Sequence, residues 1–326
     1  MLPLVSIIVP TYQREKLLCE TIGYLLAQDY PNRELLIVDQ SSNHEPETAR
    51  YLDSIAGQVR YFHLAQPNLP AARNFGIRQS KGELVVFLDD DMVIGTDLIS
   101  QLIETFSAPE VWGATGFVLS PGESDSGKYG PYRRFVSDMT EFKEEKRIRI
   151  RGFIGCLMSF RSQLFEKIGY FDEWIGTQLM AAGEDFEFCQ RAVVRGYGLF
   201  LNPRITTLHL GAREGGCGRR SLGPIEVERA QLRLSIYAVL KNRRYSGWWG
   251  WADALASCYR RFILNRSLFK STAAGLVRKH TMLWHTTREV MTLFRSGFEG
   301  RNAGSGTADG EAVPLKESEV KSQTSC

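Results

Sequence analysis

Short apolar runs alternate with amphipathic stretches along the first third of the chain. Four runs are typical of buried strands, because each is short and largely apolar: residues 5–9, 35–38, 59–64 and 83–88. The stretches between them place apolar side chains at helical spacing: residues 14–28, 45–55 and 70–79. Strands that alternate with helices in this way predict an α/β fold with a Rossmann-like, mostly parallel sheet flanked by helices.

The pattern is more mixed after residue 110. Strands are predicted at 152–160, 198–201 and 205–210, and helices at 161–168 and 183–195. Residues 222–296 are helical in pattern, basic and aromatic. The last 28 residues, 299–326, are rich in Gly, Ser, Thr and Glu, so we predict a disordered tail.

Polar residues follow three of the predicted strands at the point where each strand ends. Pro10, Thr11 and Tyr12 end the first strand, Asp39 ends the second, and Asp89 follows the fourth. In an open parallel sheet, ligands bind in the crevice outside the carboxyl ends of the strands. We therefore expect these residues to face one ligand site.

Three consecutive carboxylates, Asp89, Asp90 and Asp91, make the fourth strand end the most informative feature of the chain. Acids this close repel one another, and burying them is costly unless a cation lies between them. Side chains alternate along an extended chain, so Asp89 and Asp91 share one side and Asp90 faces the other. An Asp-x-Asp pair can bind a divalent cation and hold ribose or phosphate beside it. The alternative is a solvated turn whose aspartates cap a helix.

A second acidic element, Glu184 and Asp185, follows Gly183 at the predicted start of a helix. The helix dipole stabilises carboxylates there, so we expect low pKa values and ionised side chains at neutral pH. The alternative is simple helix capping, supported by the i,i+4 pair of Glu187 with Arg191.

His209 and Arg73 are candidate site residues whose interpretation depends on these acids. A lone histidine at a strand end, such as His209, is usually structural, but imidazole readily completes the coordination of a metal that carboxylates already hold. Arg73 lies in the first turns of a helix, where the dipole does not favour a cation. It would be suited to an anionic ligand or an acidic cluster, and the alternative is an ordinary surface arginine.

Composition excludes several classes of protein. The 326 residues are 43% hydrophobic, which suits a globular core, and a net charge of +3 gives no reason to expect nucleic acid as a partner. The six cysteines form no CxxC pair, which argues against a zinc ribbon and suits a reducing compartment. The sequence predicts neither a signal peptide nor a spanning helix, so we expect a cytoplasmic protein. P-loop, GxGxxG and nucleophile-elbow motifs are absent.

Five segments together resemble glycosyltransferase family 2 in their order and approximate spacing: residues 5–12, 36–39, 72–76, 87–91 and 183–185. The resemblance implies a GT-A fold, a nucleoside-diphosphate sugar donor, a divalent metal ion (Mn²⁺ or Mg²⁺) and inversion at the anomeric carbon. The QxxRW motif of processive polymer synthases is absent, which favours transfer of a single sugar. We expect a GT-A domain at 1–215, a helical region at 216–298 and the tail at 299–326.

On the donor side, the resemblance implies contacts with the nucleotide. Pro10, Thr11, Tyr12 and Asp39 would bind the donor, with Asp39 accepting a hydrogen bond from a uracil ring. Arg73 would lie near the base or the diphosphate. Asp89 would face the ribose, and Asp90 would face the sugar or a neighbouring backbone amide.

For the metal and the chemistry, the resemblance implies a second set of roles. Asp91 would bind the metal ion through its carboxylate, and His209 would be a further ligand. Asp185 would be the general base that deprotonates the acceptor hydroxyl, with Glu184 supporting it. Gly169 to Glu173 resembles the family's segment on the acceptor side.

The segment 222–296 carries 13 Lys and Arg against 4 Asp and Glu, and four of the six tryptophans: Trp248, Trp249, Trp251 and Trp284. Basic residues with aromatic residues are typical of helices on an anionic membrane surface, which would suit a lipid-linked or membrane-presented glycan acceptor and a peripheral place on the plasma membrane. The alternative is a helical cap whose tryptophans are core residues.

Two other functions remain open from the sequence. A nucleotidyltransferase that makes sugar nucleotides uses a similar sheet but usually has a Gly-rich basic loop after the first strand, and residues 11–14 form no such loop. A non-catalytic sugar-nucleotide binding module would not need a base, whereas Asp91 and Asp185 are both present.

Overall fold

The structure of the protein is a computed structural model that describes residues 2–121, 147–177, 183–212, 214–216, 226, 229–242 and 273–295. The described strands form one nine-stranded sheet with the order β3-β2-β1-β4-β8-β6-β9-β5, and β7 pairs with β9 beside this path. The strands are β1 Val5–Thr11, β2 Arg33–Asp39, β3 Arg60–His63, β4 Leu84–Leu88, β5 Met92–Val93, β6 Val111–Leu119, β7 Ile148–Ile150, β8 Leu157–Arg161 and β9 Gly198–His209.

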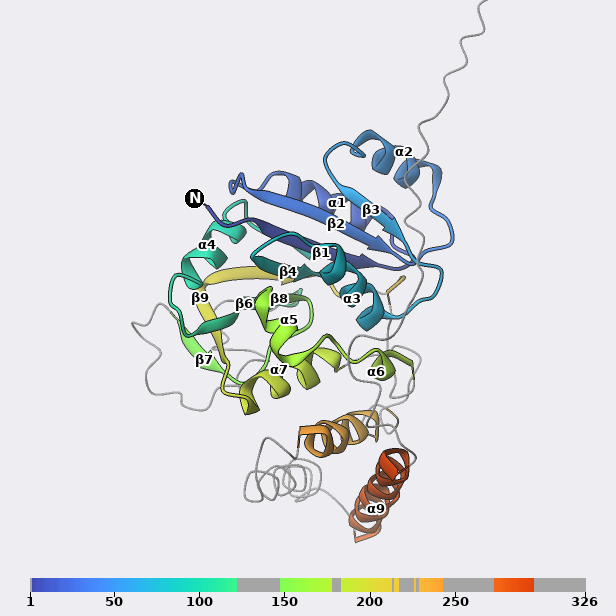
Figure 1. The fold of residues 1–326 in the computed structure, drawn as a ribbon. Coiled ribbons are helices and arrows are strands. Elements are labelled where there is room, and N and C mark those ends of the chain that lie inside the picture. The colour runs from blue at the N-terminus through green and yellow to red at the C-terminus, as the bar shows by residue number, and fades with distance from the viewer. Residues whose placement is uncertain are drawn as a thin grey trace, which may run out of the picture.

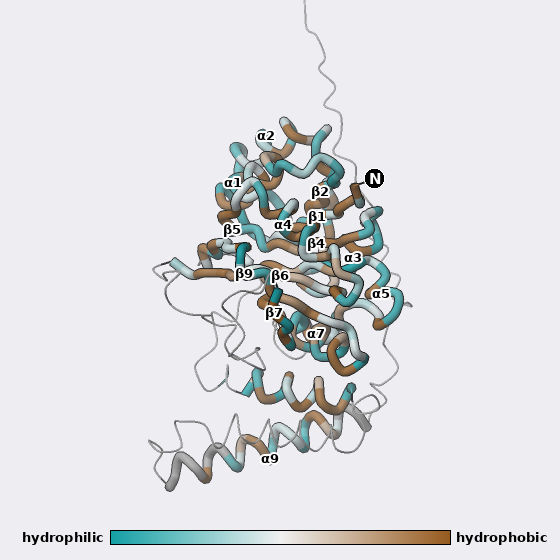
Figure 2. The backbone as a smooth tube through the Cα atoms, turned by 90° about the vertical axis from the view of Figure 1, so that its left-hand side faces the viewer, coloured by the Kyte–Doolittle hydropathy of each residue, from teal (hydrophilic) through white to brown (hydrophobic). Residues whose placement is uncertain are grey.

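Helices cover the sheet on both faces (Figure 1). They are α1 Lys16–Leu26, α2 Pro46–Ser54, α3 Leu69–Gln79, α4 Leu98–Thr105, α5 Gln163–Ile168, α6 Glu173–Thr177, α7 Glu184–Val194 and α9 Ala273–Arg295, with a further helix at residues 229–242. Because helices cover both faces, β1 and β4 are buried along their whole length. Their sequences are therefore largely apolar, and Figure 2 shows them as hydrophobic stretches.

The first half of the sheet is parallel, as the sequence predicts. Strands β3, β2, β1 and β4 share one direction, so their carboxyl ends lie at one edge. In this register Thr11 pairs with Asp39, and Asp39 pairs with His63. The strand ends therefore bring the predicted ligand residues together.

The second half of the sheet is mixed, which the apolar pattern did not predict. Strand β8 runs antiparallel to both β4 and β6, and β5 and β7 run antiparallel to β9. The two short strands expected at 198–201 and 205–210 are one strand, β9. Its pairing with β6 shifts register between Thr115 and Phe117, and this irregularity with Pro203 explains the break in the sequence pattern.

Five buried phenylalanines join β4, β8, α5 and α7 into one core. The ring of Phe188 lies 4.6 Å from Phe171, 4.9 Å from Phe160 and 5.3 Å from Phe165, measured between ring centroids. Phe87 of β4 contacts the same group. The cluster fixes α7 against the sheet, and α7 carries the second acidic element in its first turn.

The 229–242 helix lies next to α6 and α7, and α9 lies on its far side (Figure 1). A separate apolar cluster joins them: Ile175, Leu232, Leu234, Ile236, Tyr237, Leu240 and Val290. These helices agree with the helical region expected after residue 216, whereas Trp248, Trp249, Trp251 and the tail at 299–326 lie outside the described residues. No helix in the described part of the chain is long and apolar enough to cross a bilayer.

We expect Phe188→Ala to lower the free energy of unfolding by about 3–5 kcal/mol, because it opens a cavity among three aromatic rings. Denaturant unfolding measures this change. Tyr24→Ala is the control: Tyr24 is 38% exposed on α1, so its loss should cost less than about 1 kcal/mol. Equal losses in the two variants would contradict the assignment of Phe188 to the core.

Candidate active site

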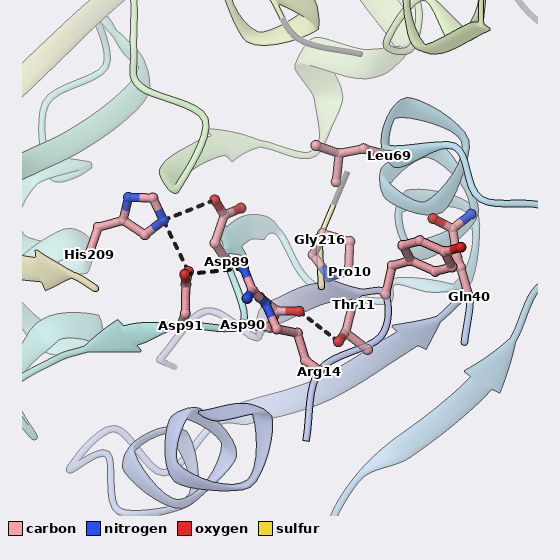
Figure 3. Close-up of a pocket in the computed structure, with 11 residues that line it drawn as sticks. Pro10, Thr11, Arg14, Gln40, Leu69, Asp89, Asp90, Asp91, His209 and Gly216 are labelled. Atoms are coloured by element: carbon pink, nitrogen blue, oxygen red, sulfur yellow. Dashed lines mark hydrogen bonds and ion pairs between the residues drawn. The ribbon is translucent and has the colours of Figure 1, made fainter. Parts of the chain in front are cut away.

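The side chains of the aspartate triplet alternate in direction after β4, as predicted, so that Asp90 points away from Asp89 and Asp91. Asp89 and Asp91 point toward His209, whose Nε2 lies 3.0 Å from Asp91 Oδ1 and 3.9 Å from Asp89 Oδ2 (Figure 3). His209 is the last residue of β9, and its pairing with Met92 of β5 brings it to the triplet. Two carboxylates and one imidazole therefore converge from strands that are far apart in sequence.

These three side chains have the geometry of a metal site. One ligand atom from each of Asp89, Asp91 and His209 lies within 4.8 Å of the other two. Burial alone would raise the pKa of Asp91, but the hydrogen bond and the charge of His209, the amide of Ala212 at 2.8 Å and Arg14 together lower it. Asp91 is thus ionised and able to bind a cation. Two oxygens and one nitrogen suit Mn²⁺, whereas Mg²⁺ prefers oxygen ligands throughout.

Asp90 faces away from this site and is held inside the protein. Its carboxylate accepts a hydrogen bond from Thr11 Oγ1 at 2.7 Å and pairs with Arg14 Nε at 3.1 Å. Burial raises the pKa of Asp90 to about 7. Asp90 remains only a predicted donor contact, because its carboxylate is already engaged by Thr11 and Arg14.

Arg14 is the site residue that sequence reasoning missed. Its Nη2 lies 3.3 Å from Asp91 Oδ2, so it bridges two members of the triplet, and its Nη1 donates to the carbonyl of Glu214. Gly216 donates its backbone N–H to the carbonyl of Tyr12 at 2.7 Å. Residues 214–216 therefore lie beside the end of β1, a long-range contact that no spacing in the sequence indicates.

A pocket lies at the carboxyl ends of β1, β2 and β4 (Figure 3). We call it the strand-end pocket, and its lining residues are Pro10, Thr11, Tyr12, Arg14, Gln40, Leu69, Asp89, Asp90, Asp91, His209 and Gly216. Seven of the predicted site residues are in this set, so the ends of β1 and β4 face one pocket, whereas Asp39 at the end of β2 does not line it. Gln40 and Leu69 are additional, and no chemical pattern in the sequence marks either of them.

Asp39 does not line the strand-end pocket. It is fully buried, and its carboxylate accepts hydrogen bonds from His44 and Tyr61 and, at 2.8 Å, from the backbone N–H of Ser41. Burial alone would raise its pKa, but these hydrogen bonds lower it, so Asp39 is ionised. Its proposed contact with a uracil ring stays a prediction, while its neighbour Gln40 reaches the pocket.

Arg73 lies between the two acidic elements. It is 1% exposed, pairs with Glu184, donates to the carbonyl of Gly155 at 2.9 Å and lies 3.6 Å from Asp89 Oδ1. Arg73 therefore lies in an acidic cluster, as one interpretation of the sequence predicted. The alternative, an ordinary surface arginine, is wrong. Its expected place near the base or the diphosphate stays a prediction.

Glu184 and Asp185 lie in the first turn of α7, as predicted, after Gly183 with φ +112°. Burial, with the charge of Glu184, raises the pKa of Asp185 to about 6, although Arg73 opposes this. The expected low pKa is therefore wrong for Asp185, because desolvation beside a second acid outweighs the helix dipole. A carboxylate with this pKa is a better proton acceptor near neutral pH than an ordinary aspartate.

The sequence model described as Glycosyl transferase family 2 matches residues 6–169, half of the chain. The chain belongs to glycosyltransferase family 2. It is 29% identical over 181 residues to an uncharacterized glycosyltransferase of Rickettsia felis, and 29% identical over 228 residues to the O-antigen biosynthesis protein RfbC of Myxococcus xanthus. These alignments cover 54% and 64% of this chain, but only 30% and 17% of the two relatives.

Two solved structures have a similar fold. A mannosyltransferase, PcManGT from Pyrobaculum calidifontis, in complex with GDP-Man and Mn²⁺, gives a TM-score of 0.57 at 17% identity, over 91% of this chain and 80% of that one. TarS residues 1–349 from S. aureus, in complex with UDP-GlcNAc, gives 0.58 at 17% identity, over 90% and 92%. These similarities confirm the predicted GT-A fold.

We expect Asp91→Asn to weaken Mn²⁺ binding tenfold or more, because it removes a charged ligand from the Asp89, Asp91 and His209 cluster. Calorimetric titration with Mn²⁺ in the presence of UDP measures the change. Asp97→Asn is the matched control, since Asp97 is exposed at the N-cap of α4 and does not line the strand-end pocket. An equal loss in both variants would contradict the assignment of the metal ligands.

Proposed function

We propose that this family 2 glycosyltransferase moves one sugar from a UDP-linked donor to an acceptor hydroxyl, with inversion and with a divalent metal ion. The observation that carries the proposal is the separation of two acid groups by Arg73. Asp89, Asp91 and His209 can hold a metal and diphosphate on one side, and Glu184 with Asp185 lies on the other. A single displacement needs a leaving-group site and a base on opposite faces of the sugar.

On the donor side, Asp91 and His209 would hold the cation, with Asp89 beside them facing the ribose. When bound, the cation would neutralise the negative charge that develops on the departing diphosphate. Pro10, Thr11 and Tyr12 would line the nucleotide, with Gln40 and Leu69 extending the same pocket.

On the acceptor side, Asp185 would take the proton from the attacking hydroxyl. A sugar hydroxyl is a weak nucleophile, and a positioned base commonly contributes about 10²–10⁴-fold to the rate. Glu184 supports this role because its negative charge helps to raise the pKa of Asp185. A single displacement, which inverts the anomeric carbon, needs one base, and Asp185 would serve as that base.

The choice of nucleotide rests on the resemblance of Asp39 to the family's uracil-binding aspartate. The two similar structures hold GDP-Man and UDP-GlcNAc, so the fold itself accepts both bases. A panel of UDP-, GDP- and dTDP-sugars, with and without Mn²⁺, tests the choice by thermal shift and by release of the nucleoside diphosphate. Stabilisation by GDP- or dTDP-sugars alone would overturn the UDP assignment.

We expect Asp185→Asn to abolish turnover while the affinity for UDP with Mn²⁺ stays within about twofold, because the base does not contact the nucleotide. In the unmodified enzyme, the rate should fall tenfold per pH unit below about pH 6, because Asp185 must be ionised to accept a proton. Rates of nucleoside-diphosphate release from pH 4.5 to 8, together with calorimetry, measure both effects.

The outcomes of this experiment separate the candidate functions. Intact turnover in Asp185→Asn with lost donor affinity would contradict the role of Asp185. A binding module would show donor affinity and no turnover in the unmodified protein. A nucleotidyltransferase would form a sugar nucleotide from a sugar phosphate and a nucleoside triphosphate.

We further propose that the acceptor is a glycan or a lipid-linked glycan precursor and that the C-terminal helices contact an anionic membrane surface. The name of the M. xanthus relative, an O-antigen biosynthesis protein, supports a glycan acceptor. Val277 is 66% exposed and Trp284 is 68% exposed, seven residues apart on one side of α9, with exposed Arg288 four residues further on. Apolar and basic side chains on one helix face suit a lipid surface.

We expect the protein to sediment with phosphatidylserine-containing vesicles at low salt and to be released in part at high salt, because basic residues contribute through screened charges. Trp284→Ala should weaken this binding at both salt concentrations. Vesicles of phosphatidylcholine alone are the control. No sedimentation with either vesicle at low salt would contradict the membrane proposal.

A further inference from the structure

The first turn of α7 is held from two sides. On one side, Glu184 pairs with the buried Arg73. On the other side, the fully buried Glu187 accepts hydrogen bonds from Arg191 at 2.8 and 3.0 Å and lies 3.2 Å from Lys241 Nζ. Asp185 lies between these two anchors in the chain. Its position therefore depends on partners outside α7.

Lys241 belongs to a buried cluster of charges that joins α7, the 229–242 helix and Asp172, the residue before α6. Its Nζ donates to Asp172 Oδ2 at 2.6 Å, and Tyr237 donates to the same oxygen. The side chains of Asp172, Glu187, Arg191 and Lys241 are each less than a tenth exposed. Two acids and two cations balance one another here, so removal of Lys241 would leave an uncompensated buried charge.

The 229–242 helix also touches the residue that precedes the acid pair. A Cβ atom added to Gly183 would lie 2.0 Å from Leu234 Cδ2, which shows that the side chain of Leu234 packs directly against the backbone of Gly183. The ring of Tyr237 packs on Trp174 of α6 at 5.1 Å between centroids. Apolar and ionic contacts of the helix therefore converge on α6 and the start of α7, and none of its residues lines the strand-end pocket.

We propose that the 229–242 helix positions the general base, and that Lys241 and Leu234 are its positioning residues. This rests on the proposed role of Asp185. The helix fixes the first turn of α7 through Glu187 and Gly183, so a shift of the helix moves Asp185 relative to the sugar. A misplacement of about 1 Å can reduce a rate about 10²-fold, because the reacting atoms must lie close together and aligned. Such a shift leaves donor binding unaffected, because the strand-end pocket is formed at the ends of β1, β2 and β4 and not by α7 or the 229–242 helix.

The test compares Lys241→Met with Arg233→Met in the full-length chain. Arg233 lies on the same helix but pairs with Glu289 of α9, so its substitution removes a cation without touching α6 or α7. Turnover is measured as release of the nucleoside diphosphate from the donor that the panel selects, and donor-site integrity as calorimetric affinity for UDP with Mn²⁺. Lys241→Met should lower kcat about 10- to 100-fold with UDP affinity within about twofold, and Arg233→Met should leave both within about twofold.

Two further variants separate positioning from general loss of structure. Lys241→Arg keeps the charge and should recover most of the turnover. Leu234→Ala removes the contact with Gly183 while leaving the charge cluster in place, and it should lower kcat with little change in UDP affinity. Unchanged turnover in both Lys241→Met and Leu234→Ala would overturn the proposal, as would an equal loss of UDP affinity and turnover.

The same measurements distinguish this proposal from the proposed function. If Asp185→Asn retains turnover, Asp185 is not the base, and the proposed function fails together with the positioning role that rests on it. If Asp185→Asn is inactive but Lys241→Met and Leu234→Ala are fully active, only the positioning role fails.

Discussion

Five carboxylates meet at one edge of the sheet, and the site depends on the cations that lie between them. Arg14 bridges Asp90 and Asp91, and Arg73 lies between Asp89 and Glu184. Two arginines do not neutralise five acids, so the negative charge stays in surplus. Burial, together with the charges of neighbouring acids, raises the pKa values of Asp90 and Asp185. Asp89 and Asp91 lie with His209 on the side of the cluster where a divalent cation would add positive charge.

The sheet topology creates this meeting point. Strand β4 is parallel to β1 on one side and antiparallel to β8 on the other. The parallel neighbour delivers Thr11 and Tyr12, and the loop before β8 delivers Gly155, whose carbonyl binds Arg73. The backbone N–H of Asp89 bonds to the carbonyl of Cys156 at 3.2 Å. Asp89 thus lies where the two halves of the sheet join, which places the aspartate triplet close to the Arg73–Glu184 pair at the start of α7.

Features that depend on local pattern could be predicted from the sequence. The apolar strands predicted the parallel half of the sheet, and the alternation of side chains predicted the opposite directions of Asp89 and Asp90. The position of Gly183 before paired acids predicted the start of α7. The resemblance to glycosyltransferase family 2 joined these pieces into one expected site, and the family match confirms the family.

Features that depend on tertiary contacts could not be predicted in this way. The pKa of Asp185 follows from burial beside Glu184, which a dipole argument from sequence ignores. Arg14 meets the aspartates across more than seventy residues of chain, and Lys241 meets Asp172 across 69. An antiparallel strand such as β8 has the same apolar content as a parallel one, so its direction is not encoded in hydropathy.

The most direct test of the metal-dependent donor site is a crystal of the enzyme grown with Mn²⁺ and UDP, with anomalous data collected at the manganese edge. We expect one strong peak within bonding distance of Asp91 and His209, with the UDP diphosphate on its other side. A peak at another place, or UDP bound in the strand-end pocket with no manganese beside Asp91, would contradict it.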